Sequence, residues 1–156
     1  RVVEAYSKVG GGRPLVMVGG APYADDLQRR IRQLADTRVM LPGPIYGEGY
    51  RQLLFGCRLY IHATEVGGTH PALVEAMGAG RPVLYYDTPE NREVAGPAGR
   101  PFRFSGVQSL ETVLAEVVEN DAALSELGTR SRLRVEERYL WSDVADRYEK
   151  VLRTLC

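Results

Sequence analysis

Short and nearly continuous apolar runs alternate with segments of helical spacing along the first part of the chain. Runs of this kind are typical of strands that are covered on both faces in a parallel sheet. They occupy residues 15–18, 39–41, 59–62 and 82–86. The segments with helical spacing are residues 1–9, 25–34, 49–57 and 71–80. This alternation predicts βαβ units and therefore an α/β fold, a Rossmann-like doubly wound parallel sheet with helices on both faces.

The rest of the chain predicts one short strand, at residues 102–104, and then helices alone. Three helices follow, each opening on a residue that favours an N-cap: residues 109–118, 121–139 and 142–155. No linker or internal repeat divides the 156 residues, so we expect a single domain over residues 1–156. Because the chain opens inside a predicted helix, we also expect it to be truncated at its N-terminus.

Net charge and cysteine content exclude several functional classes. The 20 basic residues are matched by 20 acidic ones, so no electrostatic footprint for nucleic acid is present. Cys57 and Cys156 are far apart, which indicates a reduced compartment rather than a disulfide scaffold. The sequence has neither a long apolar run nor a signal-peptide pattern, which indicates a cytoplasmic protein. Association with a membrane surface through something outside this chain stays open.

The common motifs for cofactors, metals and nucleophiles are absent. The sequence contains no P-loop and no nucleophile elbow, and no dinucleotide-binding glycine motif follows a predicted strand. Neither His62 nor His70 belongs to a Cys/His cluster with metal spacing. We therefore expect no cofactor and no metal site.

The most informative segment is the loop that precedes the helix beginning at Pro71. It reads Gly67-Gly68-Thr69-His70. Glycines allow the main chain to approach a ligand closely, and free N–H groups at a helix start attract negative oxygen. The loop therefore suits a diphosphate, with Thr69 or His70 near the N-cap. An ordinary glycine-rich turn between a strand and a helix is an alternative of equal weight.

Two carboxylates flank this loop and could accept hydrogen bonds from sugar hydroxyls. Glu75 lies one turn inside the helix among apolar neighbours, so we expect it to be half-buried and to bind ribose; a glutamate that pairs with an arginine, or that is simply solvated, is the alternative. Glu65 could contact the sugar or be solvated. His70 could donate to a phosphate oxygen or pack as a capping residue. Gly19-Gly20, after the first strand, is a weaker diphosphate contact, and the whole arrangement suits a nucleotide-sugar.

The segment ALVEAMGAGRPVL closely resembles the signature of the retaining nucleotide-sugar glycosyltransferases of the GT-B class. Similar stretches are VMVGG near residue 18, LPGPI near residue 43 and PENREVAGPAG, which is similar to a loop of that family carrying Glu93. VGGTHPALVEAMGAG looks like the bacterial rhamnosyltransferase-type subgroup. The resemblance implies the C-terminal, donor-binding half of a GT-B fold, with an N-terminal domain that binds the acceptor.

The resemblance also implies roles for individual residues. Glu75 would hold the ribose, and the main chain of Gly68, Thr69 and His70 would meet the diphosphate and the donor sugar. Glu65 would be the catalytic glutamate that contacts the donor sugar. The residues that would line the nucleotide and its base are Leu73, Val74, Ile45 and Tyr46.

Two features of the chain depart from the family pattern. The paired glutamates of the family stand closer together than Glu65 and Glu75, and in an ungapped alignment Gly67 takes the place of the first one. Glu65 fits that role only if the loop bulges by two residues. The family's diphosphate clamp, an arginine and a lysine after an early strand, has no counterpart in this chain.

The leading hypothesis is the donor-binding domain of a glycosyltransferase that moves a sugar from a nucleotide-sugar to a glycan or other acceptor with retention, as in polysaccharide biosynthesis. We expect this chain alone to be inactive, because the acceptor site lies elsewhere. A sugar-nucleotide epimerase-like domain and a noncatalytic nucleotide-binding or interaction module are the alternatives. The sequence does not identify the base, the sugar or the acceptor.

Overall fold

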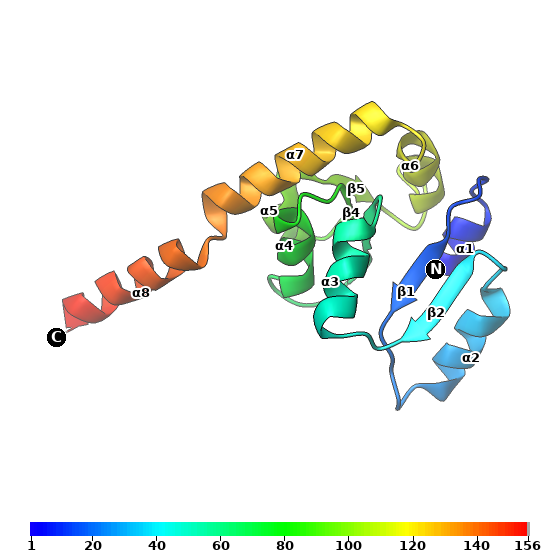
Figure 1. The fold of residues 1–156 in the computed structure, drawn as a ribbon, viewed down its shortest axis with the longest axis horizontal. Helices are drawn as coiled ribbons and strands as arrows, with labels where there is room; N and C mark the ends of the chain where they lie inside the picture. The colour runs from blue at the N-terminus through cyan, green and yellow to red at the C-terminus, as the bar shows by residue number, and fades with distance from the viewer. Residues whose placement is uncertain (156) are drawn as a thin grey trace. The chain divides into compact units, whose positions relative to one another are not determined.

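The computed structural model describes residues 1–155, and Cys156 lies outside the described residues. Strands and helices alternate from α1 to β4, and helices alone follow β5 (Figure 1). The chain divides into two compact units. The first comprises Arg1–Gly56 and Phe102–Asp121, and the second comprises Cys57–Pro101 and Ala122–Cys156.

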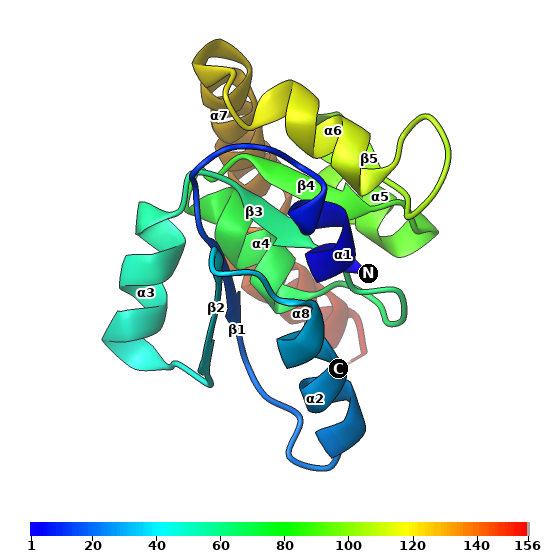
Figure 2. The ribbon, with the colours of Figure 1, turned by 90° about the vertical axis from the view of Figure 1, so that its right-hand side faces the viewer.

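A two-stranded parallel sheet organises the first unit. β1 (Leu15–Val18) pairs with β2 (Val39–Gly43), with Leu15 opposite Val39 and Val18 opposite Gly43. α2 (Asp25–Leu34) connects the two strands, and α3 (Gly47–Gly56) follows β2. Figure 2 shows the two strands side by side.

The core of the first unit lies where α1 (Val2–Ser7) packs on α6 (Leu110–Val117). Both helices contribute buried side chains: Val3, Ala5, Tyr6, Leu110, Val113, Leu114 and Val117. Ser109 caps α6, since its hydroxyl accepts a hydrogen bond from the Thr112 amide at 3.3 Å. The predicted cap is therefore confirmed.

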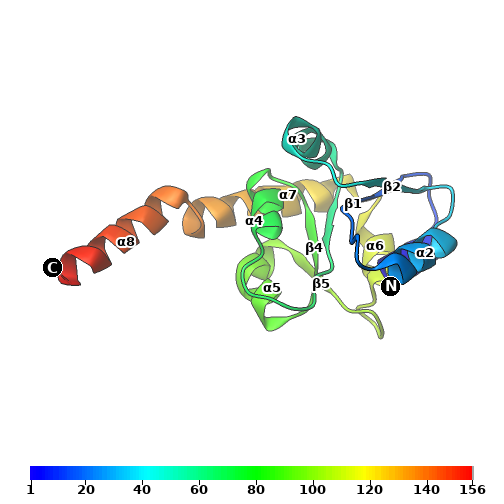
Figure 3. The same ribbon diagram turned by 90° about the horizontal axis from the view of Figure 1, so that it is seen from below.

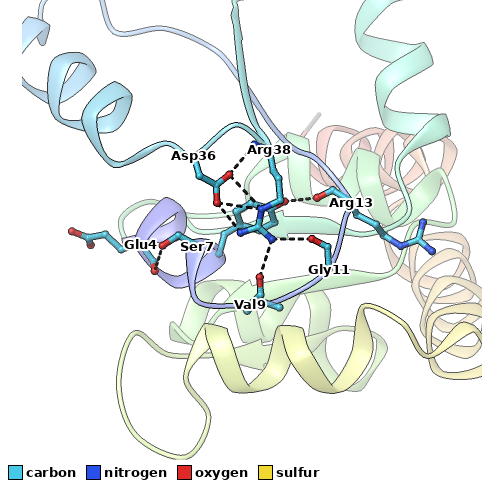
Figure 4. Close-up of polar contacts among 8 residues, drawn as sticks. Glu4, Ser7, Val9, Gly11, Arg13, Asp36 and Arg38 are labelled. Carbon is cyan, nitrogen blue, oxygen red and sulfur yellow. Dashed lines mark hydrogen bonds and ion pairs between the residues drawn. The ribbon is translucent and has the colours of Figure 1, made fainter.

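Arg38, just before β2, fixes the glycine-rich turn between α1 and β1 (Figure 4). Its Nη1 donates to the carbonyl oxygens of Val9 at 2.9 Å and Gly11 at 3.1 Å, and its Nη2 pairs with Asp36 at 2.7 Å. The guanidinium also lies over the Tyr6 ring, 4.6 Å from its centroid. The hydrogen bond from Arg38 lowers the pKa of Asp36. The turn thus has a structural explanation that needs no ligand.

The second unit contains the strands that come later in the chain. β3 (Tyr60–His62), β4 (Val83–Tyr86) and β5 (Arg100–Phe102) form one sheet in that order, and β5 reaches the boundary between the units. β3 and β4 are parallel and are connected by α4 (Pro71–Gly78). α5 (Pro89–Ala95) lies beside α4 (Figure 3), and the 3₁₀ turn Gly96–Ala98 follows it.

α7 (Asp121–Arg138) holds this unit together through close contacts. A Cβ atom on Gly128 would lie 2.6 Å from the Gly80 oxygen, so the two main chains nearly touch. The Ser131 hydroxyl donates to Ala98 O at 3.1 Å, and Arg134 donates to the carbonyl oxygens of Glu93 and Val94 at the end of α5. α8 (Trp141–Leu155) follows and buries no residue.

The predicted α/β fold with parallel strands is confirmed, and most predicted elements are found within a few residues of their expected bounds. One predicted strand is shifted, and one predicted loop was wrong. The strand expected at residues 102–104 is β5 and begins two residues earlier. Residues 89–95, expected as a loop, form α5, because the Thr88 hydroxyl accepts from the Asn91 amide at 3.2 Å and Pro89 occupies the first turn.

The prediction of strands covered on both faces holds for β4 but not for β2. Val83 and Leu84 in β4 are fully buried, whereas Met40 in β2 is 54% exposed and Leu41 is exposed as well. A βαβ unit supplies one crossover helix, here α2, and one helix covers one face of a strand pair. A continuous apolar run therefore did not suffice to predict burial.

No helix within residues 1–155 has the length and apolar character needed to cross a membrane. The same residues hold no group of three or more His, Cys, Asp or Glu side chains that could bind a metal ion. A single domain truncated at its N-terminus stays a prediction.

Candidate functional site

The loop between β3 and α4 is the candidate site in the second unit. Gly68 and Thr69 are exposed, and within residues 1–155 the amides of Gly68, Thr69 and His70 donate to no acceptor. His70 is the N-cap residue of α4, with no side-chain capping bond, and Pro71 at the first position has no N–H to offer. Consecutive free amides at a helix start form a ready site for an anion.

A side chain in place of Gly67 would displace this loop. Its φ of +128° belongs to a region that residues with a Cβ rarely adopt, and an added Cβ would lie 2.8 Å from His70 Cε1. The His70 ring therefore rests against the main chain of Gly67. This contact fixes the path of the loop up to the helix start.

His62, at the end of β3, lies beside His70 in the interior of the unit. The two ring centroids are 5.0 Å apart, with their planes tilted by 52°. His62 is only 5% exposed, and its Nε2 has no hydrogen-bond partner in residues 1–155. Burial, and secondarily the charge of His70, lowers the pKa of His62 to about 4. The imidazole of His62 is therefore neutral at neutral pH.

Asn91, the buried third residue of α5, anchors the beginning of the loop. Its Nδ2 donates to Thr64 O at 2.9 Å and to Tyr86 O at 3.0 Å, so it ties the chain after β3 to the end of β4. Neither Asn91 nor His62 was predicted to be a site residue from the sequence. Asn91 lies within a segment read as a loop, and His62 was noted only as a histidine of a predicted strand.

The two predicted carboxylates are both exposed. The expectation of a half-buried Glu75 was wrong, because Leu73, Ala76 and Met77 form the buried face of α4 and leave Glu75 on the other side. Glu75 is close enough to Tyr60 to contribute, after burial and Cys57, to the raised pKa of that phenol. The sugar-binding roles of Glu65 and Glu75 stay predictions.

The apolar residues predicted to line the nucleotide differ in exposure. Leu73 is fully buried in the core, and its amide donates to His70 O at 3.0 Å. Val74 is half-buried, and its amide donates to the same oxygen at 3.3 Å. The contact of these two residues with a nucleotide stays a prediction.

The remaining predicted residues belong to the first unit. The Gly19 amide donates to Gly43 O at 3.0 Å and so continues the pairing of β1 with β2, while Gly20 contacts the Pro44 ring. Ile45 is half-buried, and Tyr46 is 83% exposed. The structure thus groups Gly67 to Glu75 in one unit and these four residues in the other.

The fold and the loop define an α/β protein of the Rossmann type with an exposed glycine-rich loop after a parallel strand. The sequence model of the family described as Glycosyl transferases group 1 matches residues 2–121, so the chain belongs to this family. No match was found among the curated proteins.

Solved structures of GT-B glycosyltransferases have the same fold. HepE from Anabaena in complex with UDP and glucose has a TM-score of 0.86 and 18% sequence identity, over 98% of this chain and 44% of that one. The sucrose-phosphate synthase from Thermosynechococcus elongatus has a TM-score of 0.86 and 19% identity, over 99% of this chain and 41% of that one. The chain therefore spans less than half the length of these proteins. The GT-B relationship is confirmed, whereas the rhamnosyltransferase-type subgroup stays a resemblance.

Proposed function

We propose that this chain binds the nucleotide-sugar donor of a glycosyltransferase. The observation that carries the proposal is the row of amides at Gly68, Thr69 and His70, directly before α4, that have no acceptor within residues 1–155. A diphosphate satisfies several adjacent N–H donors at once, and the positive end of the helix dipole favours its charge. Membership of the group 1 glycosyl transferases makes a nucleotide-sugar the diphosphate to test first.

The other predicted residues take their roles around this diphosphate. Glu75 accepts from the ribose hydroxyls, and Glu65 contacts the donor sugar. Leu73 and Val74 line the nucleotide. The contacts of Gly19 and Gly20 with the diphosphate, and of Ile45 and Tyr46 with the base, stay predictions.

Uridine is the base to test first. HepE has been solved with UDP and with UDP-glucose, and its fold matches almost the whole of this chain. The exposed ring of Tyr46 offers an apolar face on which a base can stack.

Transfer proceeds with retention of anomeric configuration in this proposal. The oriented amides of the loop stabilise the charge that develops on the leaving diphosphate, which is electrostatic catalysis. An N-terminal domain of the whole protein supplies the acceptor site, so the chain alone binds the donor without transferring it. A cytoplasmic location and peripheral membrane association belong to the same proposal.

The direct test is a melting-temperature screen of the chain against UDP, GDP, ADP and dTDP. Ligand at 100 times its Kd adds about 2.7 kcal/mol to the free energy of unfolding, which moves the transition measurably. Uridine without phosphate is the control and should give a much smaller shift. If none of the four diphosphates shifts the transition, the chain is not a donor-binding domain.

Sugar transfer is tested separately with the chain and UDP-glucose. We expect no turnover. Robust transfer or epimerisation by the chain alone would contradict the proposed division of labour between the two domains.

A further inference from the structure

His62 is the one buried imidazole of the described residues, and the proposed function leaves it without a task. It ends β3, directly beneath the loop, and its Nε2 is buried without a partner in residues 1–155. An unpaired buried nitrogen costs free energy that a folded protein normally avoids. Its presence beside a candidate ligand site points to a hydrogen bond that forms in the liganded state.

The geometry identifies His70 as the partner. A centroid separation of 5.0 Å leaves about 2.8 Å between two ring nitrogens that face each other along the line of centres, within the usual hydrogen-bond range. The ring torsion of histidine is broad, so the rings can turn without moving their centres. His70 is also held in place by the loop itself, because its ring rests on Gly67.

We propose that His62 is a positioning residue for His70: its Nε2 accepts a hydrogen bond from protonated His70, whose second N–H donates to the bound diphosphate. Only the protonated imidazole has two donors, so it alone can join both partners. The inference rests on the proposed function, since the diphosphate supplies the negative charge that favours the proton on His70. It also requires the neutral His62 to carry its own proton on Nδ1.

The surroundings of His62 favour the acceptor role. Burial holds its pKa at about 4, so it does not compete with His70 for the proton. The other titratable groups near it are Tyr60, stacked at 6.3 Å, and Tyr85, opposite on β4. Burial raises the pKa of both phenols, so both are neutral. Glu75 on α4 and Cys57 before β3 act on Tyr60.

The test is nitrogen-detected NMR of the imidazole rings, with UDP as the probe. The chain has only two histidines, so the variant His70→Gln assigns both sets of signals. At saturating UDP we expect the His62 Nε2 signal to move as His70 takes up its proton, while His62 itself stays neutral. The pH at which His70 becomes protonated should rise by about one unit, a tenfold change in proton affinity.

Matched variants separate positioning from packing. His62→Phe keeps a ring but has no acceptor. It should remove most of the UDP-induced rise in the pH at which His70 becomes protonated. His62→Gln has an amide oxygen that can accept, and it should retain part of the rise. Tyr60→Phe removes the neighbouring phenol, and it should leave the titration of His70 unchanged.

The outcomes distinguish this inference from the proposed function. If UDP moves the amide signals of Gly68 and Thr69 but the His62 Nε2 signal of the unmodified chain does not respond, the inference is wrong and the function stands. An equal UDP-induced rise in the protonation pH of His70 in the His62→Phe variant would also overturn the inference. If UDP moves no loop amide, both fall together. The signal of the unmodified chain decides even if His62→Phe fails to fold.

Discussion

Two helices of this protein follow a glycine pair at the end of a parallel strand, yet their N-termini differ in charge and in hydrogen bonding. The first turn of α2 contains Asp25 and Asp26, and Asp26 pairs with Arg29. The Gly19 amide before it is already bonded to Gly43 O. α4 has no acidic residue in its first turn, and the amides of the loop before it are unbonded within residues 1–155.

The difference shows that a glycine-rich turn does not by itself make an anion site. Carboxylates in the first turn interact favourably with the helix dipole, and each stabilises the helix by about 0.3–1 kcal/mol. They also repel a second anion. The start of α2 therefore supplies its own negative charge. The start of α4 has no such carboxylate, so a bound anion can supply the negative charge there.

Gly67→Ala should have the largest effect on this contrast. Its φ of +128° and the 2.8 Å approach to His70 mean that a methyl group must displace the loop. We expect the affinity for UDP, measured by calorimetric titration, to fall roughly 30-fold, about 2 kcal/mol.

Gly12→Ala is the matched control, because an added Cβ there meets no atom within 4 Å and Gly12 lies outside the loop. It should bind UDP nearly as well as the unmodified chain. Equal losses in the two variants would mean that the loop geometry is not what matters.

Ala72→Asp makes the first turn of α4 resemble that of α2. We expect UDP affinity to drop about tenfold, or ~1.4 kcal/mol, through repulsion between the new carboxylate and the diphosphate. The free energy of unfolding should stay equal or rise slightly, since the dipole gains a favourable charge.

Salt provides the check on that variant. The loss should shrink when titrations are repeated at high ionic strength, because screening weakens exposed charges. The paired change Asp25→Asn and Asp26→Asn in α2 should leave UDP binding unaltered. A comparable change of affinity from α2 would contradict the assignment of the site to α4.

Glu75→Ala should weaken UDP binding about fivefold, which corresponds to ~1 kcal/mol for one lost hydrogen-bonding group. Glu65→Ala should change it by less than about twofold, because UDP lacks the sugar that Glu65 is proposed to contact. Calorimetric titration of both variants decides. Unchanged affinity for the Glu75 variant would remove the ribose site.

Asn91→Asp should lower UDP affinity less than Glu75→Ala does, about threefold, by loosening the anchor of the loop at Thr64. It replaces an amide donor with a carboxylate that faces carbonyl oxygens, so we also expect stability to fall by about 1–3 kcal/mol. Ser131→Ala is the comparison, since it removes another buried hydrogen bond, to Ala98. It should lower the melting temperature without changing UDP affinity.

The alternation of strands and helices could be predicted from the sequence because each element carries its own periodicity and end signals. Pro71 and Ser109 mark helix starts by local chemistry alone. The glycine-rich loop was also visible, because glycine content and a following proline are local features.

The parts of the site that escaped prediction depend on contacts between distant residues. Asn91 bonds to Thr64, 27 positions earlier, and no local pattern encodes that pairing. The exposure of Glu75 follows from which face of α4 meets the core, and apolar residues on both sides of it hid that face. The prediction that β2 is buried on both faces failed for the same reason, since the covering of a strand depends on helices elsewhere in the chain.

The contact between Gly80 and Gly128 has a consequence for how α4 can respond to a ligand. Gly80 ends the helix in a left-handed turn, with φ of +67°, and the main chain of α7 is pressed against it. That end of α4 has no room to slide along its axis. Because Leu73 near the opposite end is fully buried, α4 is held at both ends, and an incoming diphosphate would meet the loop amides on a fixed helix.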